Sequence, residues 1–408
     1  MTVRVNKSAF NIREKLSELE RPIGVKGNEL MRAETAQEAR NLVSAGRKNL
    51  IFNGSMQIAQ RGTSTTLSTG SYSLDRYYVQ SNVGSGHTWE QVSDAPSGSG
   101  LQYSGKVTVG TGASPTGTNY GRIIYYVEGY DAQQTCFGTS NAKAVTLSFW
   151  TKSSVTGTFG GCIKMQFASP YPGFFFTYTI NSANTWEYKQ ITIPAGTMSG
   201  GTMSSSNGIG FLLAFDLGEG PDRSDPAGYN NPSGSGGTLG VTGATKILAT
   251  SGATWQITGL QLEVGRNATE FEHRSYGEEL ALCQRYCQRL GPDDGTTASH
   301  YNSFASGWLR SGSILSYSLQ TQTDLPVRMR TIPSASVGGG TNTFYAQYGG
   351  TAITCSFSNL NTQGSTPQKV WIDFQPSSTA GTDGLRVVVG SDNSSGGQAN
   401  YIILSAEL

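Results

Sequence analysis

The sequence predicts a mainly β protein: a jelly-roll β-sandwich and a second, C-terminal β domain, with a short helical N-terminal arm and a connecting helix. Three observations lead to this prediction. Gly accounts for 53 of 408 residues and charged residues for only 14%, whereas Tyr, Phe and Trp together make up 10%. Short runs of alternating apolar and polar residues recur along the chain, and Gly- and Ser-rich turns separate them. From residue 49 to about 274 no helices are predicted between these runs, which favours a sandwich or jelly roll, and the composition argues against an ordinary helical enzyme and against disorder.

Net charge and cysteine content argue against several further classes of protein. The formal net charge is +1, so the strongly basic character of nucleic-acid-binding domains is missing. We find no apolar run of transmembrane length, and residues 1–16 lack the apolar core of a secretory signal. The five Cys are odd in number and scattered, which favours reduced thiols over a disulfide framework. We therefore expect no nucleic-acid partner, no membrane insertion and synthesis in a cytoplasm.

Residues 1–49 differ in composition from the rest of the chain. They carry ten Lys or Arg and six Asp or Glu, and neither Trp nor Tyr. Capping boxes at Asn11 with Glu14 and at Thr35 with Glu38 predict two helices of about ten residues each, too short to be stable alone. We expect this arm to become ordered by docking on a partner; a frayed tail is the alternative. The apolar side chains available for docking are Phe10, Ile12, Leu16, Leu19, Leu30 and Leu42.

Residues 50–275 show the pattern of a β-sandwich or jelly roll. Val145, Leu147 and Phe149 alternate with Thr146, Ser148 and Trp150, which is typical of a strand. In the last strand Gly259 lies where the apolar phase slips, as a β-bulge requires. Gly- and Ser-rich runs at 95–100 and 231–240 are expected to be surface loops. Further strands are predicted at 120–129, 174–180, 187–193, 208–217 and 254–265.

The spacing predicts a helix over 276–290. Ser275 and Glu278 form a capping box, and Gly291 with Pro292 follow as a stop signal. Cys283 and Cys287 lie on the apolar stripe of this helix, where small buried thiols are favoured over zinc ligands because two further ligands are missing. Residues 291–408 then return to a β pattern, with strands predicted at 314–320, 369–375, 384–390 and 400–408.

Few residues offer catalytic or metal-binding chemistry. The three His have no metal-site spacing, and motifs for a nucleophile, a phosphate loop or a dinucleotide are lacking. The loop DLGEGPDRSD brings Asp216, Glu219, Asp222 and Asp225 together. The favoured interpretation is a solvated loop, and the alternatives are a calcium site and a catalytic pair of carboxylates. We expect no catalytic residue and no cofactor, and leave a structural calcium open.

Aromatic side chains of the C-terminal region are the remaining candidates for binding. An exposed aromatic face can stack on the apolar C–H face of a sugar ring, while Ser, Thr, Asn and Gln bond its hydroxyl rim. General burial statistics nevertheless assign most aromatic side chains to cores. The candidates for carbohydrate contact are Tyr301, Trp308, Tyr345, Tyr348 and Trp371.

Several stretches together resemble a domain common in tail fibre and virion structural proteins of tailed phages. They are NLIFNGSMQIAQRG (49–62), YSLDRYY (72–78) and WQITGLQLEVGRNATEFEHRSY (255–276). The segment GEELALCQRYCQRL (277–290) resembles the helix that usually follows that domain. The N-terminal sequence VNKSAFNIREKLSELERPIG is similar to the start of structural proteins from marine and cyanobacterial phages. The resemblance covers residues 1–290, approximately.

The resemblance implies a virion appendage, a homotrimer in which a carbohydrate-binding-module-like jelly roll follows a particle-attachment arm. It also implies that a structural calcium can lie near the first and last strands, with Glu263 as its candidate ligand; Asp216 and Asp222 of the acidic loop are the other metal candidates. We therefore expect a non-enzymatic tail fibre that binds other virion proteins of the tail or neck through residues 1–49. Its β domains would contact host-surface glycan, and the virion would be its location. The alternatives are a polysaccharide-degrading tailspike enzyme and a purely architectural head or neck fibre.

Overall fold

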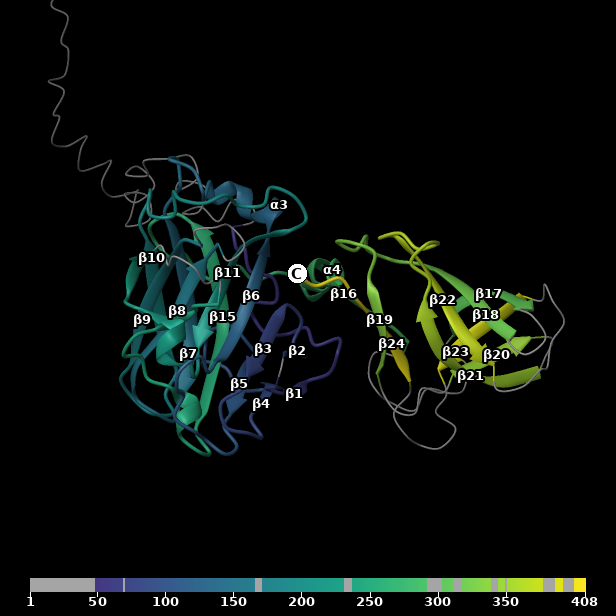
Figure 1. Cartoon of the computed structure of the whole chain (residues 1–408), viewed down its shortest axis with the longest axis horizontal. Coiled ribbons are helices and arrows are strands. Elements are labelled where there is room, and N and C mark those ends of the chain that lie inside the picture. The colour runs from purple at the N-terminus through teal and green to yellow at the C-terminus, as the bar shows by residue number, and fades with distance from the viewer. Residues whose placement is uncertain are drawn as a thin grey trace, which may run out of the picture.

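The computed structural model of the chain shows two β bodies joined at a narrow waist (Figure 1). It describes residues 48–68, 70–165, 171–230, 237–291, 303–311, 317–338, 344–348, 351–376, 386–391 and 400–408. The two helices predicted in the arm lie outside the described residues. So do the predicted attachment side chains Phe10, Ile12, Leu16, Leu19, Leu30 and Leu42.

The first body is a sandwich of two antiparallel sheets, as the sequence predicts (Figure 1). Its described residues form a six-stranded sheet in the order β1 (Ser64–Thr66), β4 (Thr88–Val92), β5 (Ser104–Thr108), β15 (Thr254–Val264), β7 (Val145–Ser153) and β10 (Glu187–Ile193). They also form a seven-stranded sheet in the order β13 (Gly228–Asn230), β9 (Gly173–Ile180), β8 (Gly157–Lys164), β11 (Ile209–Asp216), β6 (Gly121–Glu128), β3 (Tyr77–Ser81) and β2 (Ser71–Tyr72). Because β15 lies between β5 and β7, the six-stranded sheet closes only when the last strand of the body is inserted.

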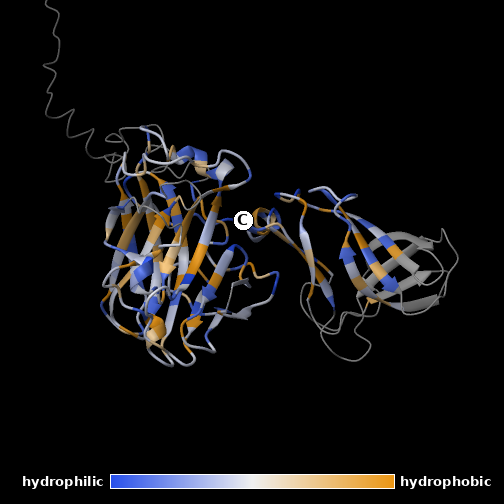
Figure 2. Cartoon of the chain, in the orientation of Figure 1, coloured by the Kyte–Doolittle hydropathy of each residue, from blue (hydrophilic) through white to orange (hydrophobic). Residues whose placement is uncertain are grey.

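The core of the sandwich consists of the inward side chains of both sheets. Val145, Leu147 and Phe149 are fully buried, in the phase that the sequence predicts. The Phe149 ring meets Phe215 of the opposite sheet edge-on, with ring centroids 5.3 Å apart. Figure 2 shows hydrophobic residues alternating with polar ones along the strands, whereas the loops are mostly polar. Each large side chain buried here contributes about 1.5–3 kcal/mol to folding.

The predicted bulge at Gly259 is confirmed. The pairing of β15 with β7 shifts register between Thr258 and Gln261, and Gly259 has a φ of +61°, which a residue without a Cβ adopts at no cost. The bulge turns Leu260 and Leu262 toward the core, where both are fully buried. One extra residue thus keeps both halves of the longest strand of the sandwich apolar on the same face.

Helices are few and short among the described residues. They are α3 (Gly129–Ala132), α4 (Tyr276–Gln284) and the 3-10 turns η1 (Gln133–Thr135), η2 (Pro221–Arg223) and η3 (Ile247–Ala249). None of the helices in the described part of the chain has the length and apolarity needed to cross a membrane.

The predicted helix over 276–290 is wrong in its second half. Its start is confirmed, because the Ser275 hydroxyl accepts a hydrogen bond from the Glu278 backbone N–H at 3.3 Å. The helix ends at Gln284, and Cys287–Leu290 form the strand β16 instead. The carbonyl of Tyr286 accepts a hydrogen bond from the backbone of Ala406 at 2.7 Å. Residues near the C-terminus therefore supply the backbone hydrogen bonds of residues 286–290, where the local spacing predicts a helix.

The second body begins at β16. Strand β16 (Cys287–Leu290) pairs with β24 (Tyr401–Ser405), which pairs with β19 (Ser334–Gly338). A closed barrel follows, in the order β17 (Ser303–Ser311), β18 (Tyr317–Asp324), β22 (Lys369–Pro376), β21 (Thr351–Leu360), β20 (Phe344–Tyr348) and β23 (Arg386–Ser391). Val370, Ile372 and Phe374 are buried in the predicted phase, in one cluster with Ile402 and Leu404. The chain ends at the waist, not at the far tip of this body (Figure 1).

Candidate functional site

The predicted carbohydrate-binding residues of the second body are described only in part. Tyr301 lies outside the described residues, and Trp308 of β17 and Tyr345 and Tyr348 of β20 are described by their backbone alone. Trp371 is half-buried in β22, where its ring packs on Gly364 so closely that an added Cβ would lie 2.8 Å from the indole. Sugar contact through these side chains stays a prediction.

The side chains predicted as metal ligands either accept hydrogen bonds from other protein groups or lie exposed without further ligands beside them among the described residues. Glu263 of β15 is buried, and its carboxylate accepts hydrogen bonds from Thr269 N and Thr269 Oγ1, both at 2.8 Å, and from Gln261 Nε2 at 2.9 Å. Asp222 is exposed in η2. In the described part of the chain, no three His, Cys, Asp or Glu side chains come together as metal ligands do. Calcium at Glu263 or Asp216 stays a prediction that no contact here supports.

The loop after β11 is only partly the solvated loop that the sequence predicts, because Asp222 is exposed whereas two of its other acids are buried. Asp216 and Glu219 are each only 1% exposed. In the connection between β11 and β15, Leu239, Val241 and Ala244 pack on the outer face of the seven-stranded sheet; we call residues 218–225 and 237–246 of this connection the strap. Gly228–Asn230 join the sheet edge as β13, and Ile247 and Leu248 pack in the core between the sheets. Its Leu239 and Val241 are fully buried against outward side chains of that sheet, such as Phe175. The expectation of a surface loop at 231–240 is therefore wrong for Leu239 and Gly240, because apolar residues in the Gly-rich run cover an apolar sheet face.

Buried charges fasten the strap to the sheet. Asp216 accepts hydrogen bonds from the backbone of Glu219 at 2.9 Å and of Val241 at 3.0 Å, and it pairs with Lys246. Lys164 of β8 donates to the Thr238 carbonyl at 2.8 Å. Since each of these groups is taken out of water, its charge is supported by partners on the strap.

Glu219 is the least satisfied of these buried acids. Arg122 Nε lies 2.7 Å from Glu219 Oε1, but outside hydrogen-bond geometry, and neither carboxylate oxygen accepts a hydrogen bond. Burial raises the pKa of Glu219 to about 8, although Arg122 opposes this shift. Glu219 therefore holds a proton at neutral pH more readily than an ordinary Glu, yet no substrate can reach a side chain that is 1% exposed.

A second buried network, which we call the joint, fixes the two bodies to each other. Glu407, next to the C-terminal residue, pairs with Arg61 at 3.1 Å and with Arg76 in the sandwich. Arg330 of the second body donates to the Asn207 carbonyl of the sandwich at 2.8 Å and to the Glu407 carbonyl at 2.7 Å. These contacts bring the C-terminal residues back onto the sandwich and connect the two bodies at the waist.

The joint continues behind α4. Glu128 of β6 accepts hydrogen bonds from Arg285 Nε at 2.8 Å and from the Tyr286 hydroxyl. Cys283 and Cys287 are fully buried beside it with free thiols, as the sequence predicts. Burial raises the pKa of both thiols, which makes them unreactive side chains of a packed face.

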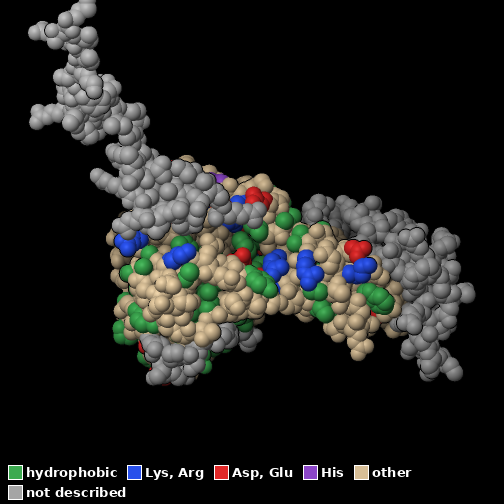
Figure 3. Space-filling view, turned by 90° about the horizontal axis from the view of Figure 1, so that it is seen from above, with side chains coloured by type: hydrophobic (Ala, Val, Ile, Leu, Met, Phe, Trp, Pro, Cys, Tyr) green, Lys and Arg blue, Asp and Glu red, His purple; other side chains and the backbone are tan. Residues whose placement is uncertain are grey.

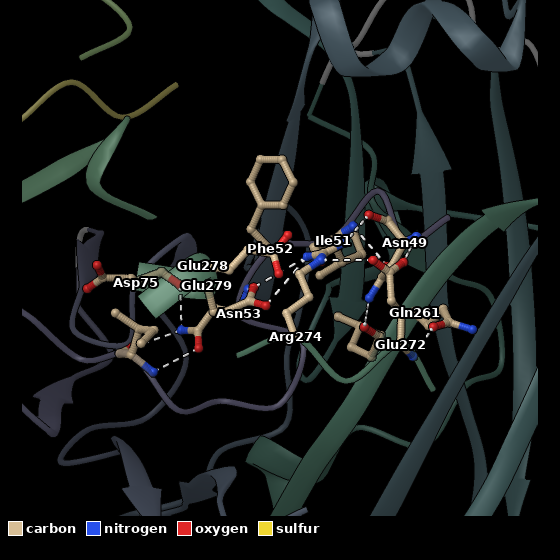
Figure 4. Close-up of polar contacts among 12 residues, drawn as sticks. Asn49, Ile51, Phe52, Asn53, Asp75, Gln261, Glu272, Arg274, Glu278 and Glu279 are labelled. Atoms are coloured by element: carbon tan, nitrogen blue, oxygen red, sulfur yellow. Dashed lines mark hydrogen bonds and ion pairs between the residues drawn. The ribbon is translucent and has the colours of Figure 1, made fainter. Parts of the chain in front are cut away.

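The base of the arm is held by a polar seam in which the ends of the sandwich meet (Figure 4). The backbone N–H groups of Lys48 and Asn49 both donate to Glu272 Oε2, at 2.8 and 2.7 Å. Arg274 donates to the Asn49 carbonyl at 2.7 Å, and Glu279 accepts from the Asn53 backbone. Lys48 and Asn49, which composition assigns to the arm, are therefore buried parts of the sandwich.

Large hydrophobic side chains are rarely exposed in the described part of the chain. Figure 3 shows hydrophobic side chains of every size scattered over one face of the molecule, without a large patch. The exposed ones are Tyr130, Tyr188, Tyr229, Tyr276 and Ile332. Of these, Tyr188 is 45% exposed and has a second, half-buried ring beside it, Trp150, with centroids 5.3 Å apart.

Trp150, Trp186 and Tyr188 form what we call the aromatic platform, on the outer face of the six-stranded sheet. Tyr188 is directly opposite Trp150 in the pairing of β10 with β7, and Trp186 lies two residues before Tyr188. Phe149 and Ile191, in the opposite phase of these strands, pack toward the core. The exposed Gln190 continues the outward row along β10. The arrangement offers aromatic surface with a polar rim.

Asp94 connects the polar groups of the aromatic platform. Its Oδ1 accepts a hydrogen bond from the Trp186 indole N–H at 3.3 Å, and its Oδ2 accepts one from Lys152. The Lys152 ammonium also lies over the Trp186 ring, 5.0 Å from its centroid. Partial burial acts to raise the pKa of Asp94, but the hydrogen bonds from Lys152 and Trp186 outweigh it and lower that pKa. Asp94 therefore stays ionised and orients both side chains.

The turn before Trp186 is fixed by Glu187. Its Oε1 accepts hydrogen bonds from the backbone N–H groups of Asn181 and Ser182, both at 2.8 Å, and Oε2 pairs with Lys189 at 2.7 Å. Although its slight burial acts against this, these bonds lower the pKa of Glu187 to about 2. Trp186 is thus held by an ordered turn, which reduces the entropy lost when a ligand binds.

Sequence reasoning missed the aromatic platform because it searched the C-terminal region. One signal was present: Trp150 lies in the polar phase of a strand whose other phase is apolar, so its ring must face outward. Trp186 and Tyr188, in the alternating run WEYKQ, give the same signal on a second strand. That the two strands are neighbours is decided by the sheet order alone.

Comparison with known proteins gives weak similarities. No family model and no curated protein matches the sequence. The enzymatically active domain of tailspike protein 4 from bacteriophage CBA120 is 13% identical over 53% of this chain and 21% of that chain, with a TM-score of 0.28. The N-terminal cellulose-binding domain of Cellulomonas fimi β-1,4-glucanase C is 12% identical over 40% of this chain and 80% of that chain, with a TM-score of 0.24.

A tandem pair of CBM22 domains from Paenibacillus barcinonensis Xyn10C is 12% identical over 89% of this chain and 99% of that chain, with a TM-score of 0.26. With TM-scores this low, none of these similarities bears on function. This mainly β chain with a sandwich body thus has a phage tailspike domain and carbohydrate-binding modules among its structural neighbours, at low sequence identity.

Proposed function

We propose that this chain is a non-enzymatic structural and adhesion protein of a phage virion, a tail fibre that contacts glycan on the host surface. The arm attaches it to tail or neck proteins, and the fibre is a homotrimer. The sequence resemblance over residues 1–290 supports the phage setting. The glycan contact rests on a separate observation, the aromatic platform.

The aromatic platform carries the glycan part of the proposal. Trp150, Trp186 and Tyr188 present aromatic surface for the C–H faces of a sugar, and Asp94 and Lys152 stand beside them as bonding partners for hydroxyl groups. The turn that holds Trp186 is ordered before any ligand arrives. An ordered aromatic surface with a polar rim is what carbohydrate recognition needs.

The burial of the acidic groups supports a binding role over a hydrolytic one. Of the four acids that the sequence brings together, Asp216 and Glu219 are buried, and each faces a cation beneath the strap, Lys246 or Arg122. Asp222 is exposed and Asp225 is half-buried. Glycoside hydrolysis needs two carboxyl groups open to the sugar, about 5–9.5 Å apart. The acids beside the aromatic platform, Asp94 and Glu187, are occupied in holding Lys152, Trp186 and the turn.

Substitution of the aromatic platform tests the glycan contact. Trp186→Ala and Tyr188→Ala should each weaken binding to host-surface polysaccharide about tenfold, because a stacked ring contributes on the order of 1.4 kcal/mol. Tyr229→Ala is the matched control, since Tyr229 is similarly exposed, at 40%, on a strand of the other sheet. Equal affinities for all variants, or release of reducing sugar from the polysaccharide by the full chain, would contradict the proposal.

Removal of the arm tests attachment. The deletion should end at residue 47, since Lys48 and Asn49 belong to the seam. The shortened chain should keep its unfolding midpoint and glycan affinity yet fail to enter virions during infection. A deletion through residue 53, which also removes the seam, should lower the unfolding midpoint as well. Normal incorporation of the chain that starts at Lys48 would disprove attachment through the arm.

A further inference from the structure

The charges around the aromatic platform indicate which class of glycan it accepts, provided that the proposed glycan contact is correct. Among the described residues, three basic side chains lie at or beside it: Lys152, Lys189 and Lys106, which is separated from Lys152 by Gln256 in the strand pairing and is paired with Glu90 at 3.4 Å. Lys152 is paired with Asp94, and Lys189 is paired with Glu187 at 2.7 Å. Lys189 also alternates with Tyr188 along β10, opposite Phe149 in the pairing, so it belongs to the other face. Near the rings, positive charge is therefore balanced by negative charge.

We propose that Asp94 is a specificity-determining residue: it neutralises Lys152 and so restricts the aromatic platform to uncharged glycans. A sugar carrying a carboxylate would meet the negative charge of Asp94 and find Lys152 already paired. A neutral hexose stacks on the rings and shares hydrogen bonds with Asp94 and Lys152 without breaking the pair.

Asp94 and Lys152 are both exposed enough for a ligand to meet their charges. The Asp94 side chain is 41% exposed and that of Lys152 is 17% exposed, so an approaching sugar reaches the carboxylate before the ammonium. Asp94 also fixes the Trp186 indole through its N–H. One side chain therefore sets both the orientation of a stacking surface and the sign of the charge at its edge.

Asp94→Asn separates these two effects. The amide oxygen can still accept the Trp186 N–H, whereas the negative charge disappears and Lys152 loses its ion pair. Binding of the full chain should be measured with neutral oligosaccharides of glucose, galactose and mannose, and with galacturonic acid oligomers. The unsubstituted chain should prefer the neutral oligomers. Asp94→Asn should bind the acidic oligomers about three- to fivefold more tightly than the unsubstituted chain does, and about 1 M salt should abolish this gain.

Two further variants control the interpretation. Adding Lys152→Gln to Asp94→Asn should remove the gain, because the freed ammonium is its source. Asp324→Asn frees Lys369 from a comparably exposed ion pair in the second body, away from the aromatic platform, and so it should leave the preference for neutral oligomers unchanged.

The possible outcomes separate this inference from the proposed function. If the unsubstituted chain binds acidic oligomers as tightly as neutral ones, or Asp94→Asn leaves the ratio unchanged, Asp94 does not set the preference, although the glycan contact stands. If the folded, unsubstituted chain binds neither class and no host polysaccharide, the proposed glycan contact fails and this inference fails with it.

Discussion

The two outer faces of the sandwich use the same kind of ion pair for opposite purposes. On the seven-stranded sheet, Asp216 and Lys246 join under the strap, where the Asp216 side chain is fully buried. On the six-stranded sheet, Asp94 and Lys152 join at the edge of the aromatic platform, where the Asp94 side chain is 41% exposed. The buried pair fastens a covering segment to the sheet, whereas the exposed pair stays available to a ligand.

This difference teaches that burial, more than residue type, decides what a charged pair does. In water an ion pair contributes little to stability, since solvent screens both charges. In a buried pair, removing one partner is costly, because the remaining charge is then buried without water or an opposite charge to stabilise it. The strap therefore closes one face of the sandwich to ligands, and the aromatic platform lies on the other face.

The largest expected effect distinguishes the two pairs directly. Asp216→Ala should lower the free energy of unfolding by about 3–5 kcal/mol, since it leaves Lys246 and two backbone N–H groups without their partner. Asp94→Ala should lower it by less than about 1 kcal/mol. Urea unfolding of both variants measures the difference. Equal losses would show that the strap is not fastened by its buried charges.

Glu219 gives the strap a pH dependence. The pKa of Glu219 is raised from 4.5 to about 8, so between these values the folded chain holds a proton that the unfolded chain releases. Stability should therefore fall as the pH rises through this window, by up to about 1.4 kcal/mol per pH unit and on the order of 5 kcal/mol in total. Glu219→Gln, which cannot ionise, should show a flatter curve of unfolding free energy against pH. Parallel curves would contradict the raised pKa.

The apolar side of the strap is tested by Leu239→Ala. Leu239 is fully buried against the seven-stranded sheet, so the cavity should cost about 3 kcal/mol, a middle value for such a substitution. Tyr188→Ala on the uncovered face should cost less than about 1 kcal/mol, because that ring is 45% exposed. Chemical denaturation compares the two variants. A Leu239 variant as stable as the Tyr188 variant would mean that the strap does not seal its face.

The smallest effect concerns the bulge beneath the aromatic platform. Gly259→Ala should lower stability by about 1–2 kcal/mol through its positive φ. Its new Cβ would also lie 3.2 Å from Trp150 and 2.9 Å from Leu101, so it should disturb the Trp150 ring. Gly252→Ala is the matched control, with a φ of +73° and open space around its Cβ. Near-UV circular dichroism should change for Gly259→Ala alone; identical spectra would place Trp150 away from the bulge.

Local sequence patterns determined the elements whose signal repeats within a few residues. The alternation around Leu147 predicts a buried strand face, the phase slip predicts the bulge at Gly259, and the capping box predicts the helix start after Ser275. The buried face of β22 follows from the same alternation. Such signals suffice because each element can bury its apolar face in only one phase.

The features that sequence reasoning missed depend on partners from distant parts of the chain. Tyr286 leaves the helical pattern because its carbonyl bonds to Ala406, which is 120 residues away in sequence. Glu219 is buried only because the strap folds back over the sheet, although its loop is rich in Gly and acidic residues. No local pattern carries information about contacts of this kind.

By itself, the sequence determined a mainly β chain with a sandwich, a second β body and a charged arm, because composition and alternation act along the chain. The tertiary structure decided which face of the sandwich is covered, which acids are buried, and that Trp150 and Tyr188 lie side by side. The physical reason is that sheet order and burial arise from pairing between distant strands, and the same side chain fastens or binds according to whether water reaches it.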